Sequence, residues 1–114
     1  MRATLASLGL GTALLAAPAG AQQTPVPPAF VEVDKGYCIA CHQLPEGTGP
    51  ATRADLGPRL EGARMRSLGR AKLRELLDDA TVPNPATVMP PYGRHRILDR
   101  AEIERLVEFL HALP

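Results

Sequence analysis

Cys38-Ile39-Ala40-Cys41-His42 is the stretch that decides the fold of this chain. Two cysteines three positions apart, with a histidine directly after the second, are typical of a covalent attachment site for a c-type haem. On one helical turn the two thiols reach the two vinyl groups along one edge of a porphyrin, and His42 then meets the ring face and binds the iron. The motif therefore predicts one haem c, bonded through Cys38 and Cys41 and ligated by His42.

Three other uses of paired cysteines fit the sequence less well. A thioredoxin-like dithiol needs a strand-to-helix junction, and the flanks of the motif, at residues 31–34 and 43–50, offer at most one short strand between them. A zinc site needs a fourth ligand besides the two thiolates and His42, and neither His95 nor His111 has a paired spacing. A structural disulfide leaves the adjacent histidine without a role. Haem attachment is therefore the favoured interpretation.

The size and composition of the chain favour one small domain that needs an additional stabilising group. It has 114 residues, two Phe, two Tyr and no Trp, so its own aromatic core is poor. A chain this short usually needs a disulfide, a metal or a cofactor to complete its core. A covalently held haem would supply a large apolar plate for the side chains to pack on.

Residues 1–21 are predicted to be a secretory signal peptide. Arg2 gives a minimal positive region, residues 5–17 a mostly apolar region, and Ala19-Gly20-Ala21 a small-x-small cleavage site. A retained membrane anchor is less favoured, because the apolar run is interrupted and a span needs about 18 or more apolar residues. We therefore expect cleavage near Ala21, a periplasmic location and no membrane span in the mature chain. Export agrees with the motif, because bacteria attach c-type haem outside the cytoplasm.

The charge balance excludes one class of partner. The full chain has 13 Lys and Arg against 12 Asp and Glu, and loss of Arg2 with the signal peptide leaves 12 of each. Such a balance gives no support to a nucleic-acid partner. Basic side chains nevertheless crowd one stretch, which is either a solvated face or a docking surface. They are Arg53, Arg59, Arg64, Arg66, Arg70, Lys72 and Arg74.

Three helices are predicted after a proline-rich tail at residues 22–28. The first is short, at residues 29–35, with Pro28 suited to its start. The middle helix, at residues 70–80, has the i, i+3, i+4, i+7 spacing of an apolar face at Leu73, Leu76, Leu77 and Ala80. In the last helix Asp99 is the N-cap with Glu102 three residues on, and the apolar face is Ile103, Leu106, Val107 and Leu110.

Two long loops separate these helices. Residues 43–68 are rich in Gly and Pro and lack periodicity, so they are predicted to be an irregular loop along a haem edge. Residues 81–98 form the second loop. The prediction is therefore an all-α fold, with about three helices and long loops wrapped around one haem in a domain at residues 29–114.

The second axial ligand is predicted to be Met89. It lies in a proline-stiffened loop, where a thioether can be held rigidly toward a metal, whereas Met65 lies between two arginines in a polar setting. His95 is the alternative ligand, and His111 is more simply a helix-end residue. A metal-bound histidine also donates its other ring N–H to an acceptor, for which the carbonyls of the two Gly-Pro pairs, at Pro50 and Pro58, are candidates.

The order of these motifs resembles a class I cytochrome c. It comprises Cys38-x-x-Cys41-His42, Gly57-Pro58-x-Leu60, a methionine loop and a final amphipathic helix. In that family the proline of Gly-Pro-x-Leu receives the N–H of the proximal histidine. The resemblance therefore implies Pro58 rather than Pro50 as the acceptor.

A longer stretch is similar to the SoxX family, the monohaem cytochrome subunits of the Sox thiosulfate-oxidising system. The stretch is Asp79-Ala80-Thr81-x-x-Asn84-Pro85-x-x-Val88-Met89-Pro90-Pro91-Tyr92-Gly93-x-His95-x-Ile97-Leu98, together with Gly36-x-Cys38-x-Ala40-Cys41-His42. The resemblance implies Met89 as the distal ligand. It also implies a heterodimer with a SoxA-type dihaem or monohaem cytochrome subunit, which acts on a SoxYZ-type carrier and passes electrons to a downstream acceptor.

In that family the complex is an L-cysteine S-thiosulfotransferase, which oxidatively joins thiosulfate to a cysteine of the carrier. The reactive cysteine is expected on the partner, because this chain has no free thiol once Cys38 and Cys41 are bonded to haem. No residue of this chain is therefore expected to be catalytic, and its role is one-electron relay. The alternative is a free periplasmic class I cytochrome c that carries electrons. We expect the face around the Met89 loop or the haem edge to contact SoxA.

Overall fold

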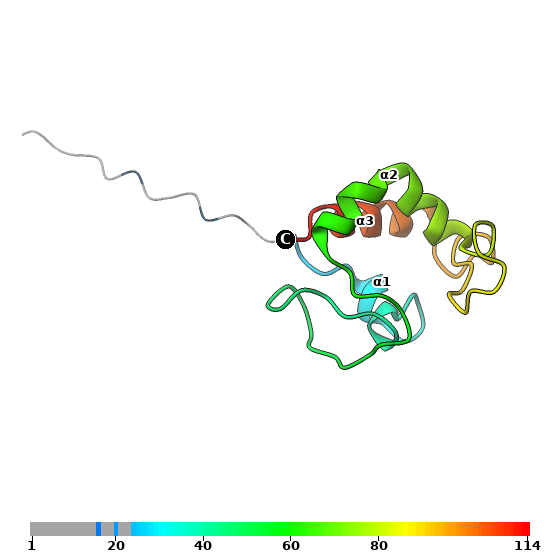
Figure 1. The fold of residues 1–114 in the computed structure, drawn as a ribbon, viewed down its shortest axis with the longest axis horizontal. Coiled ribbons are helices and arrows are strands. Elements are labelled where there is room, and N and C mark those ends of the chain that lie inside the picture. The colour runs from blue at the N-terminus through cyan, green and yellow to red at the C-terminus, as the bar shows by residue number, and fades with distance from the viewer. Residues whose placement is uncertain (1–15, 17–19, 21–23) are drawn as a thin grey trace, which may run out of the picture.

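The computed structural model describes residues 24–114, together with Ala16 and Gly20. The predicted signal peptide and its cleavage site lie outside the described residues, apart from those two. The chain forms α1 (Pro28–Val31), the short 3-10 helix η1 (Cys38–Ala40), α2 (Gly62–Asp79) and α3 (Arg100–His111) (Figure 1). The described part contains no strand. The predicted all-α fold is therefore confirmed.

Helix α3 forms as its sequence pattern predicts. The Asp99 side chain accepts a hydrogen bond from the backbone N–H of Glu102 at 2.7 Å. The Glu102 carboxylate accepts one in return from the N–H of Asp99 at 2.9 Å, which completes a capping box. The apolar face of the helix is buried, at Ile103, Leu106, Val107 and Leu110.

Helices α2 and α3 lie side by side and enclose most of the core (Figure 1). Two bidentate ion pairs join their outer faces, Arg70 with Glu108 at 2.8 and 3.0 Å and Arg74 with Glu104 at 2.5 and 2.7 Å. Exposed pairs of this kind add little stability, but they fix which faces of the two helices meet. With Lys72 to Glu75 at 3.0 Å and Arg59 to Glu61 at 3.9 Å, four members of the predicted basic cluster are paired within the chain.

Helix α2 begins eight residues before the predicted start, so the expectation of an irregular loop over residues 43–68 is wrong for its last seven residues. The cause is a contact with the other end of the chain. The N–H of Gly62 donates to the carbonyl of Pro114 at 2.9 Å, and the Arg66 guanidinium donates to the carbonyl of Leu113 at 2.6 Å. The first bond satisfies a free N–H at the helix start, and the second ties the same turn to residues 113–114, which no local pattern reveals.

Gly69 interrupts α2 and explains why the apolar spacing does not run through it. Its φ of +80° and ψ of 160° lie outside the helical region, so the helix is two segments joined at a kink. Met65, in the first segment, is only 3% exposed. The polar setting expected for Met65 from its arginine neighbours is therefore wrong.

Helix α1 is one turn long and ends before the predicted residue 35. Beyond Val31 the chain folds back, and the N–H of Tyr37 donates to the carbonyl of Ala29 at 3.1 Å. Gly36 makes this reversal possible, because a Cβ there would lie 2.5 Å from the same carbonyl oxygen. The reversal brings η1 directly against α1.

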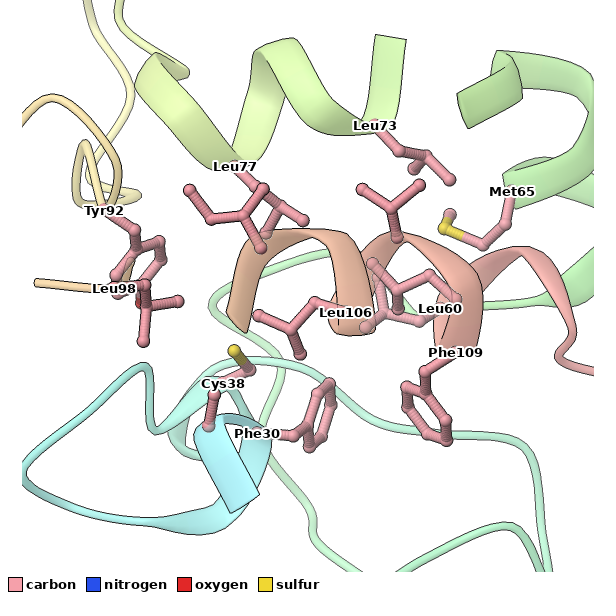
Figure 2. Packing of buried hydrophobic residues seen from close by; sticks show 14 of the residues in the cluster. Phe30, Cys38, Leu60, Met65, Leu73, Leu77, Tyr92, Leu98, Leu106 and Phe109 are labelled. Atoms are coloured by element: carbon pink, nitrogen blue, oxygen red, sulfur yellow. The ribbon is translucent and has the colours of Figure 1, made fainter. Parts of the chain in front are cut away.

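The core links all of these elements around η1. Figure 2 shows Phe30 of α1, Leu73 and Leu77 of α2, and Leu106 and Phe109 of α3 gathered with Cys38. The rings of Phe30 and Phe109 meet edge to face, with centroids 5.8 Å apart. The first cysteine of the motif is therefore part of the core. In the part of the chain described here, no helix is both long enough and apolar enough to span a membrane.

Candidate functional site

One cavity of about 360 Å³ brings the predicted site residues together. It lies between η1 with the loop that follows it, helices α2 and α3, and the loop between those helices. Cys38, Cys41, His42, Pro58 and Met89 all line it. Most of its other lining residues are apolar, including Phe30, Leu60, Leu73, Leu76, Leu77, Leu106 and Leu110. Its volume and lining are those of a site for an apolar ligand.

The loop after the motif holds the His42 ring at one nitrogen. Nδ1 of His42 lies 2.7 Å from the carbonyl oxygen of Pro58, and a carbonyl can only accept, so Nδ1 carries the proton and donates. The neutral ring then has its lone pair on Nε2, the form in which histidine binds a metal. Of the two proline carbonyls considered, that of Pro58 is the one hydrogen-bonded to the ring.

Gly57 provides the room for that ring. A Cβ at position 57 would overlap the imidazole, lying 2.6 Å from Nδ1. The N–H of Gly57 also donates to the carbonyl of Cys41 at 2.8 Å, which ties the loop to the motif. The Gly-Pro pair therefore forms a cradle that only glycine permits.

The two cysteines are free thiols, with Cys38 buried and Cys41 half-buried. Burial raises the pKa of the Cys38 thiol to about 11, whereas a redox-active dithiol needs a lowered pKa. No group of three or more His, Cys, Asp or Glu side chains within the described residues could hold a metal ion. A disulfide, a reactive dithiol and a zinc site therefore all fit less well than haem. The apolar cavity, the two thiols and the cradled histidine fit a haem.

Met89 is partly buried and packs against the core from the loop between α2 and α3. Its N–H donates to the Thr87 hydroxyl at 3.1 Å, and prolines follow it directly in the chain. Met65 lines the same cavity from α2, so the structure brings both methionines to the site. The assignment of Met89 as the ligand stays a prediction. His95 is exposed and does not line the cavity.

Two further residues line the site that were not predicted to bind the cofactor. Tyr92 is one of the buried core residues (Figure 2). Its hydroxyl donates to the carbonyl of Gly36 at 2.8 Å, so it joins the Met89 loop to the turn before Cys38. Burial raises its pKa to about 12, which keeps the donor proton in place. Among the described residues, Arg64 is the one lysine or arginine that lines the cavity, and it brings a positive charge there. Among so many arginines, no local pattern distinguishes it.

Comparison with known proteins agrees with this geometry. The sequence profile of the family described as cytochrome c matches residues 32–114. No curated protein matches the chain in sequence. The crystal structure of SoxXA from P. pantotrophus shares the fold, with a TM-score of 0.62 and 24% identity over 77% of this chain and 82% of that chain. The chain therefore belongs to the cytochrome c family, whose domain transfers electrons through a covalently bound haem c.

Proposed function

We propose that this chain carries one haem, bonded through Cys38 and Cys41, with His42 and Met89 as the axial ligands of its iron. The observation that carries the proposal is the His42 ring, held at Nδ1 by Pro58 beside an apolar cavity that both thiols line. The bound haem would supply a one-electron iron couple.

The residues of the chain itself position and shield that couple. The Pro58 carbonyl orients His42 and increases the basicity of its free nitrogen. The leucines of α2 and α3 exclude water from the cavity, and a less polar surrounding favours the iron form of lower charge. The Met89 thioether is a neutral, soft donor that also favours the reduced metal, so these residues together support a relatively high potential.

The cellular setting that we propose is a periplasmic SoxAX-type complex, in which this chain is the electron-transfer subunit. Two observations support it, namely the resemblance to SoxX over residues 79–98 and a fold shared with SoxXA. With both cysteines bonded to haem the chain has no thiol nucleophile, so the partner must supply the reactive cysteine. The complex would join thiosulfate to a SoxYZ-type carrier, while this subunit passes electrons to a downstream acceptor.

The surface of the cavity supports a protein partner. Val88 is 73% exposed and Leu56 is 68% exposed, and both are cavity-lining residues from different loops. Val82, in the same loop as Val88, is also exposed. Apolar side chains that gather beside a site are typical of a protein contact. We place the SoxA contact at this rim.

The attachment is tested by denaturing mass spectrometry of the exported protein. One haem adduct is expected, and its loss is expected when Cys38 and Cys41 are both replaced by serine. A wild-type chain that reaches the periplasm without an adduct would contradict the proposal. The same spectrum gives the mature N-terminus, which is expected near Gln22.

The setting is tested by co-expression with a SoxA-type cytochrome, followed by gel filtration. Co-elution is expected, with thiosulfate-dependent reduction of the haem when the carrier is added. Val88→Asp should weaken co-elution, whereas Val33→Asp should not, because Val33 is 77% exposed but does not line the cavity. A protein that stays monomeric with SoxA, and exchanges electrons alone, would instead be the free carrier.

A further inference from the structure

The loop that carries Met89 leaves α2 and returns to the end of the same helix. Asp79, the last residue of α2, is only 4% exposed. Its Oδ1 accepts from the N–H of Thr81 at 3.0 Å and from the Thr81 hydroxyl at 2.5 Å. Its Oδ2 accepts from the guanidinium of Arg94 at 2.8 Å. One carboxylate therefore holds both ends of the loop.

Backbone groups close the loop at the same place. The N–H of Gly93 donates to the carbonyls of Leu77 and Asp78, at 3.3 and 3.1 Å, and the N–H of Arg94 donates to Asp78 at 3.1 Å. Gly93 packs so closely on Asp78 that a Cβ would overlap its carboxylate. Residues 81–93 are therefore tied at their base.

Within the loop the polar contacts are local. The Asn84 side chain accepts from the N–H of Ala86 at 3.2 Å, and the Thr87 hydroxyl accepts from the N–H of Met89. Such short-range bonds shape the turns but do not fix the loop to the rest of the domain. The loop is fixed to the rest of the domain by two other contacts. One is the base, whose charge-assisted hydrogen bonds are stronger than neutral ones, and the other is the Tyr92 hydroxyl.

The charge of Asp79 persists at neutral pH. The Thr81 hydroxyl, and then the Arg94 guanidinium, lower the pKa of the carboxyl to about 2. A buried carboxylate with these partners is costly to leave unpaired, so opening the base of the loop is opposed.

We propose that Asp79 is the positioning residue for the axial methionine: by closing the base of the loop it keeps the Met89 thioether at the cavity. This inference rests on the proposed function, which assigns Met89 to the iron. Asp79 does not line the cavity, so it acts through the loop. An added ligand such as imidazole competes with the thioether, and its apparent affinity rises with the fraction of molecules whose loop is open.

The test is an imidazole titration of the ferric holoprotein, in which the thioether-to-iron charge-transfer absorption is the signal that is measured. Asp79→Asn should lower the imidazole concentration at half-loss of the band by about tenfold, because charge-assisted bonds at the base are lost. Asp34→Asn is the control. It removes the same charge from an exposed turn outside the loop and α2, and it should titrate like the wild type.

Two milder variants keep the test decisive if Asp79→Asn does not fold. Thr81→Val and Arg94→Gln each remove one side-chain partner of the Asp79 carboxylate. Each should shift the titration in the same direction by a smaller factor. Titrations that match the wild type in every variant that folds would overturn the role of Asp79. A wild-type protein without the charge-transfer band would instead overturn the Met89 assignment, and with it this inference.

Discussion

The two sides of the cavity hold their predicted ligands in different ways. On the histidine side, the Gly57-Pro58 pair contacts the ring of His42 itself, through a hydrogen bond and a close glycine contact. On the methionine side, the anchors are hydrogen bonds of Asp79 and Tyr92, which are made to other groups of the chain and hold the loop rather than the Met89 side chain. A ligand held by direct contact resists displacement, whereas one held through a loop depends on loop closure. We therefore expect ligand exchange on the Met89 side.

The histidine side is disrupted most directly by a substitution at Gly57. Gly57→Ala places a Cβ against the imidazole, and overpacking of this kind costs about 1–3 kcal/mol of unfolding free energy. Pro58→Ala is the control, because the hydrogen bond uses the backbone carbonyl and survives the change. Chemical denaturation of both holoproteins checks the prediction. Equal stabilities for the two variants would contradict the cradle.

The hydrogen bond that links the two sides can be removed by a substitution at Tyr92. Tyr92→Phe leaves the Gly36 carbonyl without its buried donor, and the expected loss of unfolding free energy is about 1 kcal/mol. The variant should also bind imidazole more readily, since the Met89 loop loses one anchor. Tyr37→Phe provides the comparison, because Tyr37 is exposed. A change confined to stability, with imidazole binding unaltered, would show that Tyr92 does not restrain the loop.

A fall in pH acts on the methionine side through Asp79, and its expected effect on stability is smaller. The pKa of Asp79 is about 2 in the folded chain and ordinarily 3.8, so the unfolded chain binds the proton more readily. The stability that Asp79 contributes is therefore complete above about pH 4 and is lost as the pH falls toward 2. Thermal melts between about pH 5 and about pH 2 should show a shallower acid dependence for Asp79→Asn than for Asp34→Asn, which removes a carboxylate from an exposed turn. Parallel curves would contradict the lowered pKa.

The parts of the fold that depend on near neighbours in the sequence were predictable. The capping box of Asp99 and Glu102 and the apolar face of α3 lie within one element, and the structure confirms both. The early start of α2 was not predictable, because Gly62 is capped by Pro114 from the far end of the chain. The short α1 depends likewise on a close approach between Gly36 and Ala29.

The site shows the same division. The Cys-x-x-Cys-His motif is a local signal, and the resemblance to a class I cytochrome c selected Pro58, which is hydrogen-bonded to His42. The role of Asp79 was not predictable from its near neighbours, because only Thr81 is close in sequence and its second partner, Arg94, lies 15 residues on, beyond the loop. The burial of Met65 was also missed, since it follows from the packing of α2 on α3. The ligand roles of Cys38, Cys41, His42 and Met89 stay predictions.

The central claim is that His42 and Met89 are the axial ligands of one haem, and the structure offers a matched pair of variants to test it. Met89 and Met65 both line the cavity, one from a loop and one from α2. The most direct measurement is the thioether-to-iron charge-transfer absorption of the ferric protein after replacement of each methionine by alanine. Met89→Ala is expected to remove the band with the haem still attached, and Met65→Ala is expected to retain it. A band that survives in Met89→Ala would show that another residue is the axial ligand.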